Sequence, residues 1–237
     1  MKILVRLEMT FEIHVLVDPK QEEGLLQASA SIHEKHPALH SCKVMATLTS
    51  TGVSPRQPMI SGFYSATDAA DAVSFSHSVA KSVEDCGFTV TRIKVEQLIS
   101  LSDPVLDEVQ GDAYYEAHVK VGSSMPNPDR YRLLAEICLK YGAQLLINPY
   151  SIKMAPVTTM RMYDTSVASF ASKHQAFLKD LDSHGFTTYK QHLEMGVHDT
   201  NVYTDVGWLF HGSEYKVPIT EVDCPARVMA PELVAHM

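Results

Sequence analysis

Several patterns that mark large classes of protein are missing from this 237-residue chain. It has no cluster of lysine and arginine, and 20 basic against 28 acidic residues give a net charge of −8, which disfavours a nucleic-acid partner. No apolar run approaches the roughly 20 residues that cross a bilayer, and the charged N-terminal segment is unlike a secretory signal. We therefore expect no nucleic acid and no membrane among its partners.

Cysteine is scarce, and the familiar catalytic signatures are absent. The four cysteines are scattered without a C-x-x-C pair, which is typical of reduced side chains in a cytoplasmic protein. Glycine-rich phosphate loops, Walker motifs and the Ser-His-Asp nucleophile pattern are missing as well. What remains is a chain with 45% hydrophobic residues, enough for a substantial core.

An internal repeat dominates what is present. Phe11–Val17 reads FEIHVLV, and Tyr115–Val121 reads YEAHVKV about 100 residues later. Both segments alternate apolar and polar side chains, which is the pattern of a half-buried strand. Farther along, DCGFT at 85–89 recurs as SHGFT at 183–187. The repeat therefore extends over most of both halves of the chain.

Each copy continues with the same order of elements. In the first copy, we expect helices over 19–38 and 67–87 and strands over 42–48, 58–64 and 88–98. In the second copy, the matching helices are 127–142 and 165–185, and the matching strands are 144–148, 157–163 and one that begins at 186. Thr67 and Thr165 are the predicted caps of the second helix in each copy.

This order predicts an α+β protein that is a tandem duplication of a ferredoxin-like βαββαβ unit. Its two antiparallel sheets would form a pseudo-two-fold sandwich or barrel. The predicted repeats span 1–101 and 102–209, with an acidic linker over 101–112 between them. The remaining segment, 210–237, contains several prolines and is predicted to be an extended C-terminal tail.

Ionisable residues share one face of the first and last strands of each copy. Strand side chains alternate between faces, so the apolar residues face the helices and the charged residues face away from them. In the first copy this face carries Glu12, His14, Arg92, Lys94 and Glu96, and in the second copy it carries Glu116, His118, Lys120, Lys190, His192 and Glu194. Two such faces would enclose a polar pocket.

One hypothesis for this pocket is an enzyme that acts on a small polar or anionic molecule. His14 and His118 would be the acid and the base, with Glu12 and Glu116 orienting them. Ligand contacts would come from cationic residues and one carboxylate, namely Arg92, Lys94, Lys120 and Glu96. The alternatives are a non-catalytic ligand-binding protein, or an assembly protein whose sheet face meets another subunit in a homo-oligomer. A polar sheet face that is simply wetted by water is a further reading.

A metal-dependent enzyme is the third hypothesis. His118, His192 and Glu194 form a set of two histidines and one carboxylate, which suits zinc or non-haem iron. The matching position to His192 in the first copy is Lys94, whose ammonium would repel a metal ion. The divalent metal would therefore bind in the second copy alone.

The segment His198–Trp208 is dense in side chains that bind backbone or ligand, and it holds the single tryptophan. We interpret it as a turn whose Asp and Asn side chains satisfy local amides, with Trp208 packed on the body. A rim of the pocket is the alternative.

Two resemblances accompany these patterns. A histidine at the same strand position in both halves is similar to the two-histidine phosphoesterase superfamily, which requires His-x-Thr or His-x-Ser. Leu16 and Lys120 occupy that third position here, so the motif fails and its catalytic roles are not carried over. The strings FEIHVLVD, YYEAHVKV and HDTN…DVGWL resemble a family of bacterial proteins with duplicated ferredoxin-like halves. That resemblance covers roughly residues 10–209 and implies the fold, without an activity.

Overall fold

The computed structural model describes residues 8–49, 52–101, 109–122, 127–151 and 155–209. The predicted tail at 210–237 and most of the predicted linker lie outside these residues. The elements of the first half are β1 (Met9–Val17), η1 (Pro19–Gln21), α1 (Glu22–Lys35), β2 (His40–Thr49), β3 (Arg56–Ala66), α2 (Ala69–Asp85) and β4 (Val90–Leu98). Those of the second half are β5 (Val109–Val121), α3 (Pro128–Lys140), β6 (Ala143–Ile147), β7 (Val157–Thr165), α4 (Val167–Ser183), β8 (Thr188–Asp199) and η2 (Val202–Asp205).

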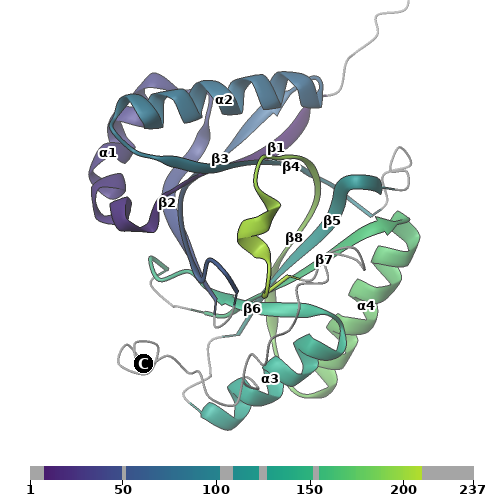
Figure 1. Cartoon of the computed structure of the whole chain (residues 1–237). Coiled ribbons are helices and arrows are strands. Elements are labelled where there is room, and N and C mark those ends of the chain that lie inside the picture. The colour runs from purple at the N-terminus through teal and green to yellow at the C-terminus, as the bar shows by residue number, and fades with distance from the viewer. Residues whose placement is uncertain (1–7, 50–51, 102–108, 123–126, 152–154, 210–237) are drawn as a thin grey trace, which may run out of the picture.

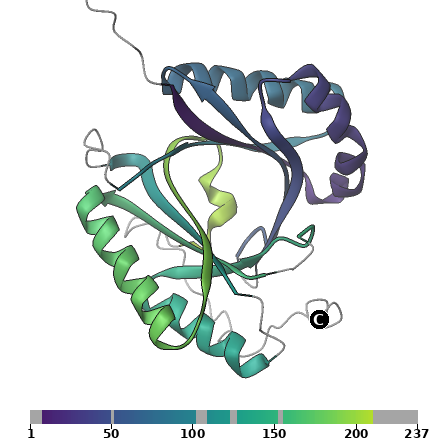
Figure 2. The same cartoon turned by 180° about the vertical axis from the view of Figure 1, so that it is seen from behind.

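The strands close into one antiparallel barrel in the order β1-β3-β2-β6-β7-β5-β8-β4. Each half contributes four neighbouring strands, and the halves join where β2 pairs with β6 and β4 pairs with β8. The α-helices α1 to α4 of the described residues lie outside the barrel, as both views show (Figure 1, Figure 2). Of the two arrangements expected, sandwich or barrel, the structure is therefore the barrel, whose closure pairs the edge strands of both halves.

Two apolar cores lie between the helices and the outside of the barrel. In the first half, Ile13, Val15 and Val17 of β1 pack with residues of α1 and α2. In the second half, Val119 and Val121 of β5 pack with residues of α3 and α4. The apolar side of the strand alternation thus faces the helices, which leaves the ionisable side for the barrel interior. The repeat boundaries at 101 and 209 stay predictions.

The caps of α2 and α4 lie one residue after the expected ones, and α1 begins at Glu22, three residues after the expected start at 19. Asp68 caps α2 by accepting a hydrogen bond from the backbone N–H of Asp71. Ser166 likewise caps α4 through the N–H of Ser169. The predicted caps Thr67 and Thr165 are wrong because the residue that follows each of them supplies the accepting oxygen, and Thr165 itself ends β7.

The first strand of the second half is longer than expected, and the last strand begins at Thr188 rather than at 186. β5 begins at Val109, inside the predicted linker, and β8 extends to Asp199 and pairs with both β5 and β4. The chain then turns into the barrel, where η2 lies in the lumen (Figure 1). The Asp199 side chain accepts from the N–H of Asn201, as a turn predicts. Trp208 is buried and lines the interior cavity, so the segment is both a turn and part of the pocket wall.

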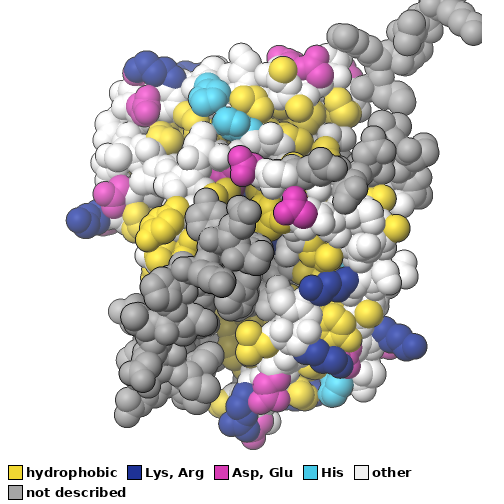
Figure 3. Space-filling model, turned by 45° about the vertical axis from the view of Figure 1, so that its right-hand side comes forward, with side chains coloured by type: hydrophobic (Ala, Val, Ile, Leu, Met, Phe, Trp, Pro, Cys, Tyr) yellow, Lys and Arg dark blue, Asp and Glu magenta, His cyan; other side chains and the backbone are white. Residues whose placement is uncertain are grey.

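The outer surface carries both signs of charge. On the face shown in Figure 3, basic and acidic side chains of the described residues are interspersed over the helices and loops. Among the described residues, no helix combines the length and the apolar character that a membrane-spanning helix requires.

Candidate functional site

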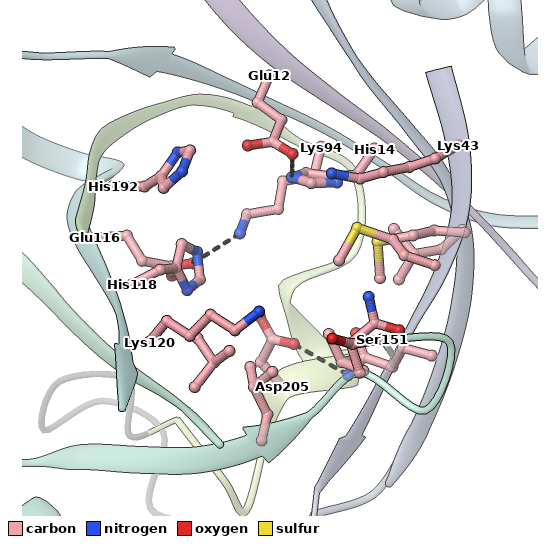
Figure 4. Close-up of a pocket in the computed structure, with 18 of the residues that line it drawn as sticks. Glu12, His14, Lys43, Lys94, Glu116, His118, Lys120, Ser151, His192 and Asp205 are labelled. Atoms are coloured by element: carbon pink, nitrogen blue, oxygen red, sulfur yellow. Dashed lines mark hydrogen bonds and ion pairs between the residues drawn. The ribbon is translucent and has the colours of Figure 1, made fainter. Parts of the chain in front are cut away.

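The barrel encloses a cavity of about 230 Å³. Side chains from strands of both halves and from the segment after β8 line it (Figure 4). The ionisable lining residues are Glu12, His14, Lys43, Arg92, Lys94, Glu116, His118, Lys120, Lys190, His192 and Asp205. The structure therefore brings most of the site residues expected from the sequence into one place.

The polar residues of β5 and β8 stand opposite one another in three rows, which we name the β5–β8 ladder. Its rows are Glu116 with Glu194, His118 with His192, and Lys120 with Lys190. The glutamates are fully buried and the histidines are half-buried. Lys120 is half-buried, and Lys190 is exposed. The ladder thus runs from buried carboxylates through imidazoles to ammonium groups near solvent. In β1 and β4, Glu12 stands opposite Glu96, His14 opposite Lys94, and Leu16 opposite Arg92.

Glu116 is held in its ionised form at the centre of the network. Its Oε1 accepts from Lys94 Nζ at 3.0 Å and lies 2.9 Å from His118 Nε2, while Oε2 accepts from the Arg161 guanidinium. Burial opposes ionisation, but the charges of Arg161, Lys94 and His118 hold the pKa of Glu116 well below its usual range. Glu116 is therefore a fixed anion that positions its neighbours.

His118 is held as a cation. Its Nε2 also lies 3.3 Å from Glu194 Oε2, and its Nδ1 is 2.9 Å from Thr159 Oγ1. Burial would lower the pKa of His118, yet the charge and hydrogen bond of Glu116 raise it well above the ordinary value. Both ring nitrogens have partners and the ring is already protonated, so His118 contributes a positive charge and does not act as a base.

Glu194 and Glu12 form a pair of carboxyl groups with opposite pKa shifts. Burial, together with the negative charge of Glu96, raises the pKa of Glu194 to about 8. For Glu12 burial opposes ionisation, but the charge of His14 and the hydrogen bond from Ser61 Oγ outweigh it and lower the pKa to about 2. At neutral pH the pair therefore holds one proton, on Glu194. Two nearby carboxyl groups whose environments separate their pKa values are a recurrent acid–base device.

His192 is the remaining imidazole of the ladder. It is half-buried, and burial together with the charge of Lys190 lowers its pKa, so the ring is neutral at neutral pH. Among the described residues, it makes no hydrogen bond. In Figure 4 its ring and the Glu12 carboxylate point into the same part of the cavity. A neutral, unengaged imidazole that faces a cavity can accept a proton.

Two cations predicted as ligand contacts are engaged within the protein. Lys94 Nζ lies 2.8 Å from Glu96 and 3.0 Å from Glu116, so it joins the two halves of the barrel. Arg92 donates to Asp199, Thr204 and Asp205, and only 2% of its side chain is exposed. Lys120 remains available, and so do Lys43 and Lys190, which form no ion pair with any described residue.

Arg161 and Asp205 belong to the network, but sequence reasoning missed them. Asp205 accepts from Arg92 and Arg161 at 2.7 and 2.8 Å, and these two cations hold its pKa below the usual range despite burial. Arg161 is on β7, a strand that carries no glutamate or histidine. The repeat pattern therefore gave no indication that the Arg161 side chain points into the barrel. Asp205 follows the last strand, and only the path of the chain into the lumen reveals its role.

Within the part of the chain that the structure describes, two groups of side chains have the ligand atoms that a metal ion needs within 4.8 Å of one another. One contains Glu96, Glu116, His118 and Glu194, but Lys94 already occupies the space between two of its carboxylates. The other contains Glu12, His192 and Glu194. The predicted set of His118, His192 and Glu194 is divided between these groups, with the two histidines in different ones. The second group fits a metal ion better, because no ammonium group is paired with its carboxylates.

Comparisons with known proteins give distant likenesses. No family model matches the chain, and no curated protein matches it either. A candidate monooxygenase of known structure from Fusobacterium nucleatum subsp. nucleatum is 12% identical with a TM-score of 0.31, covering 88% of this chain and 99% of that chain. A candidate monooxygenase from Lactobacillus acidophilus is 12% identical with a TM-score of 0.26, covering 81% and 94%. A candidate chlorite dismutase is 10% identical with a TM-score of 0.28, covering 80% and 94%. At these scores the likeness carries no inference about activity, so the function rests on the site's own residues.

Proposed function

We propose that the protein is an enzyme that moves a proton on a small anionic molecule bound in the barrel cavity. The observation that supports this most directly is a buried carboxyl group, Glu194, that keeps its proton near neutral pH beside the neutral imidazole of His192. Enzymes that transfer protons place groups with pKa values near the working pH next to each other in a partly dry site.

In this proposal the carboxyl groups and imidazoles of the ladder have separate roles. His192, which lines the cavity, accepts a proton from the bound molecule. Glu194 is buried outside the lining, within 4.8 Å of Glu12 and His192, and returns a proton through these two groups, because it is protonated at neutral pH. Glu116 and His118 position Glu194 and fix the local charge. His14 faces the cavity from β1 with Nδ1 unpartnered among the described residues, and it keeps its proposed role as a second acid–base group, oriented by Glu12 and Glu96.

A metal-dependent enzyme is the second candidate, because the ligand atoms of Glu12, His192 and Glu194 converge within 4.8 Å. Zinc is coordinated by imidazole nitrogen and carboxylate oxygen, and when bound it would lower the pKa of a water molecule or polarise a carbonyl group. In that case Glu194 would be an ionised ligand, so the two candidates require different protonation states of one residue.

Solvent-deuterium exchange tests the first candidate. Small carboxylates, keto acids and phosphate esters would be incubated with the metal-free protein in D₂O and followed by proton NMR. We expect exchange at one carbon position of a ligand, at least about 100-fold slower in His192→Gln and Glu194→Gln, as removal of an acid–base group implies. Surface His33→Gln is the matched control. Binding without exchange would make this a non-catalytic binding protein, and exchange that requires added zinc would favour the metal-dependent enzyme.

We also propose that the two halves arose by tandem duplication of a ferredoxin-like unit. The order of elements is βαββαβ in each half, and within each half the last strand pairs with the first, and the first with the third. The described cysteines, Cys42, Cys86 and Cys138, are free thiols, which supports a cytoplasmic location.

A further inference from the structure

We propose that the molecule bound in this cavity is organic and has one anionic group, a carboxylate or a phosphate, at one end and an apolar body at the other. The inference rests on the proposed function insofar as it concerns the same cavity, but it adds the chemical class of the ligand. Three features support it, namely an unbalanced pair of lysines, an apolar wall on the opposite side, and buried polar atoms without partners.

The anion would bind at the lysine row of the β5–β8 ladder. Lys120 and Lys190 are direct partners across the two strands, and both line the cavity. Like charges placed directly opposite each other destabilise a sheet unless something lies between them. No carboxylate of the described residues forms an ion pair with either lysine. A negatively charged group of the ligand would relieve the repulsion and accept hydrogen bonds from both ammonium groups.

The apolar body would contact the wall that faces the ladder. In the strand order of the barrel, β3 is four places from β5 and β2 is four places from β8, so these pairs stand on opposite sides. Met45 and Met59 are direct partners on β2 and β3, and both line the cavity. Phe63, Leu146 and Trp208 extend this apolar lining, whereas Val157 lines the cavity beside Lys120. Methionine side chains adapt to varied apolar shapes and make favourable contacts with aromatic rings.

Two buried polar atoms beside this wall lack partners. Thr47 Oγ1 and Trp208 Nε1 have no hydrogen bond to any described residue, although both residues line the cavity. An unsatisfied buried donor costs roughly 1–3 kcal/mol, so such groups usually bind a ligand or an ordered water. Polar atoms on the ligand would therefore be recognised here.

The deep end of the cavity limits the ligand to one anionic end. The buried cations Lys94, Arg92 and Arg161 are already paired with carboxylates, and so is His118. A second anionic group at that depth would meet the carboxylates of Glu12, Glu96 and Glu116, which is costly in a buried site. Lys43 forms no ion pair with any described residue, but its charge already stabilises the Glu12 carboxylate. Successive rows of the ladder are two residues apart along each strand, so the lysine row is roughly 7 Å from the histidine row. The ligand would therefore reach the histidines with its uncharged part.

Calorimetric titration with matched compounds tests this class. Phenylacetate and phenyl phosphate represent the two anionic groups, phenylacetamide removes the charge, acetate removes the apolar body, and terephthalate adds a second charge to the benzoate frame. We expect phenylacetate or phenyl phosphate to bind at least about tenfold more tightly than phenylacetamide and acetate, and benzoate to bind more tightly than terephthalate. Which anion binds better identifies the natural group as carboxylate or phosphate.

Variants locate the two ends of the ligand. Lys120→Met and Lys190→Met should each weaken binding of the aromatic anion about tenfold, as expected for loss of one charge-assisted hydrogen bond. Lys179→Met, on an exposed position of α4, should leave binding unchanged. Met59→Gln should weaken phenylacetate binding more than acetate binding.

Equal binding of phenylacetate and phenylacetamide, or unchanged binding in both lysine variants, would overturn the inference. Absence of binding by every compound would overturn it as well. Tight lysine-dependent binding without deuterium exchange would leave the ligand class standing and remove the proposed enzyme. Deuterium exchange on a ligand whose binding does not depend on Lys120 or Lys190 would support the proposed enzyme and remove the proposed ligand class.

Discussion

Replacement of Glu194 by glutamine should make the protein more stable at alkaline pH. Glutamine has the shape of a protonated glutamic acid, so the substitution fixes the neutral state that burial and Glu96 favour. The folded pKa of Glu194 is about 8 against an ordinary value of 4.5. At about 1.4 kcal/mol per pKa unit, this shift corresponds to about 5 kcal/mol as an upper limit, because Glu12 and His118 titrate together with Glu194.

The sign of the pH dependence follows from the raised pKa. Below pH 4.5 Glu194 is protonated in both the folded and the unfolded chain, and the favourable contribution of the neutral group is fully present. As the pH rises towards 8, the unfolded chain releases its proton first, so this contribution decreases and is lost once the pH passes the folded pKa. The glutamine variant carries no such proton.

Urea unfolding at intervals between pH 5 and pH 9 measures the effect. The difference in the free energy of unfolding between Glu194→Gln and the wild type should be small at pH 5 and should grow in favour of the variant by up to about 5 kcal/mol at pH 9. Glu23→Gln, at an exposed position of α1, is the control and should show a constant difference. A difference between Glu194→Gln and wild type that stays constant over this range would refute the reasoning, because Glu194 would then ionise as it does in water.

Three further predictions concern the network, the barrel and the reaction. Arg161→Met leaves Glu116 and Asp205 without a shared buried cation and should lower the free energy of unfolding by about 3–5 kcal/mol. The control Arg132→Met, at an exposed position, should change it by less than about 1 kcal/mol. Equal losses in urea unfolding would contradict this prediction. Gly196→Ala should destabilise by about 1–3 kcal/mol, because the added Cβ would lie 2.3 Å from the Tyr114 ring, and an unchanged thermal midpoint would show that the ring moves freely. The pH profile of kcat/KM should rise as His192 loses its proton, below pH 6.5, and fall near pH 8 as Glu194 loses its own; a profile that is flat across this window would exclude the pair as base and acid.

Much of the site could be predicted because strand alternation is a local property. Glu12, His14 and their counterparts Glu116 and His118 occupy alternate positions of strands whose other residues are apolar, so their shared face follows from the backbone alone. The repeat then identified equivalent positions on the last strand of each half. Both inferences require only the order of residues and the side of the sheet that the helices cover.

The partners of these residues could not be predicted, because they come from strands distant in sequence. Lys94 was expected to hold a ligand, but barrel closure places it beside Glu116 of the other half, and the ion pair engages its charge. The expected metal ligands His118 and His192 belong to separate groups because Glu12, from the first half, lies beside His192. Arg161 and Asp205 complete the network only through closure.

The sequence by itself determined the α+β class, the repeated order of elements and the face on which the ionisable residues lie, because periodicity and capping act between residues close in the chain. The tertiary structure alone decided that the two halves close into one barrel, which carboxylate keeps a proton, and which lysines remain available for a ligand. A pKa and an ion pair depend on charges a few ångströms away in space, and here those charges come from strands of both halves and from the segment after β8.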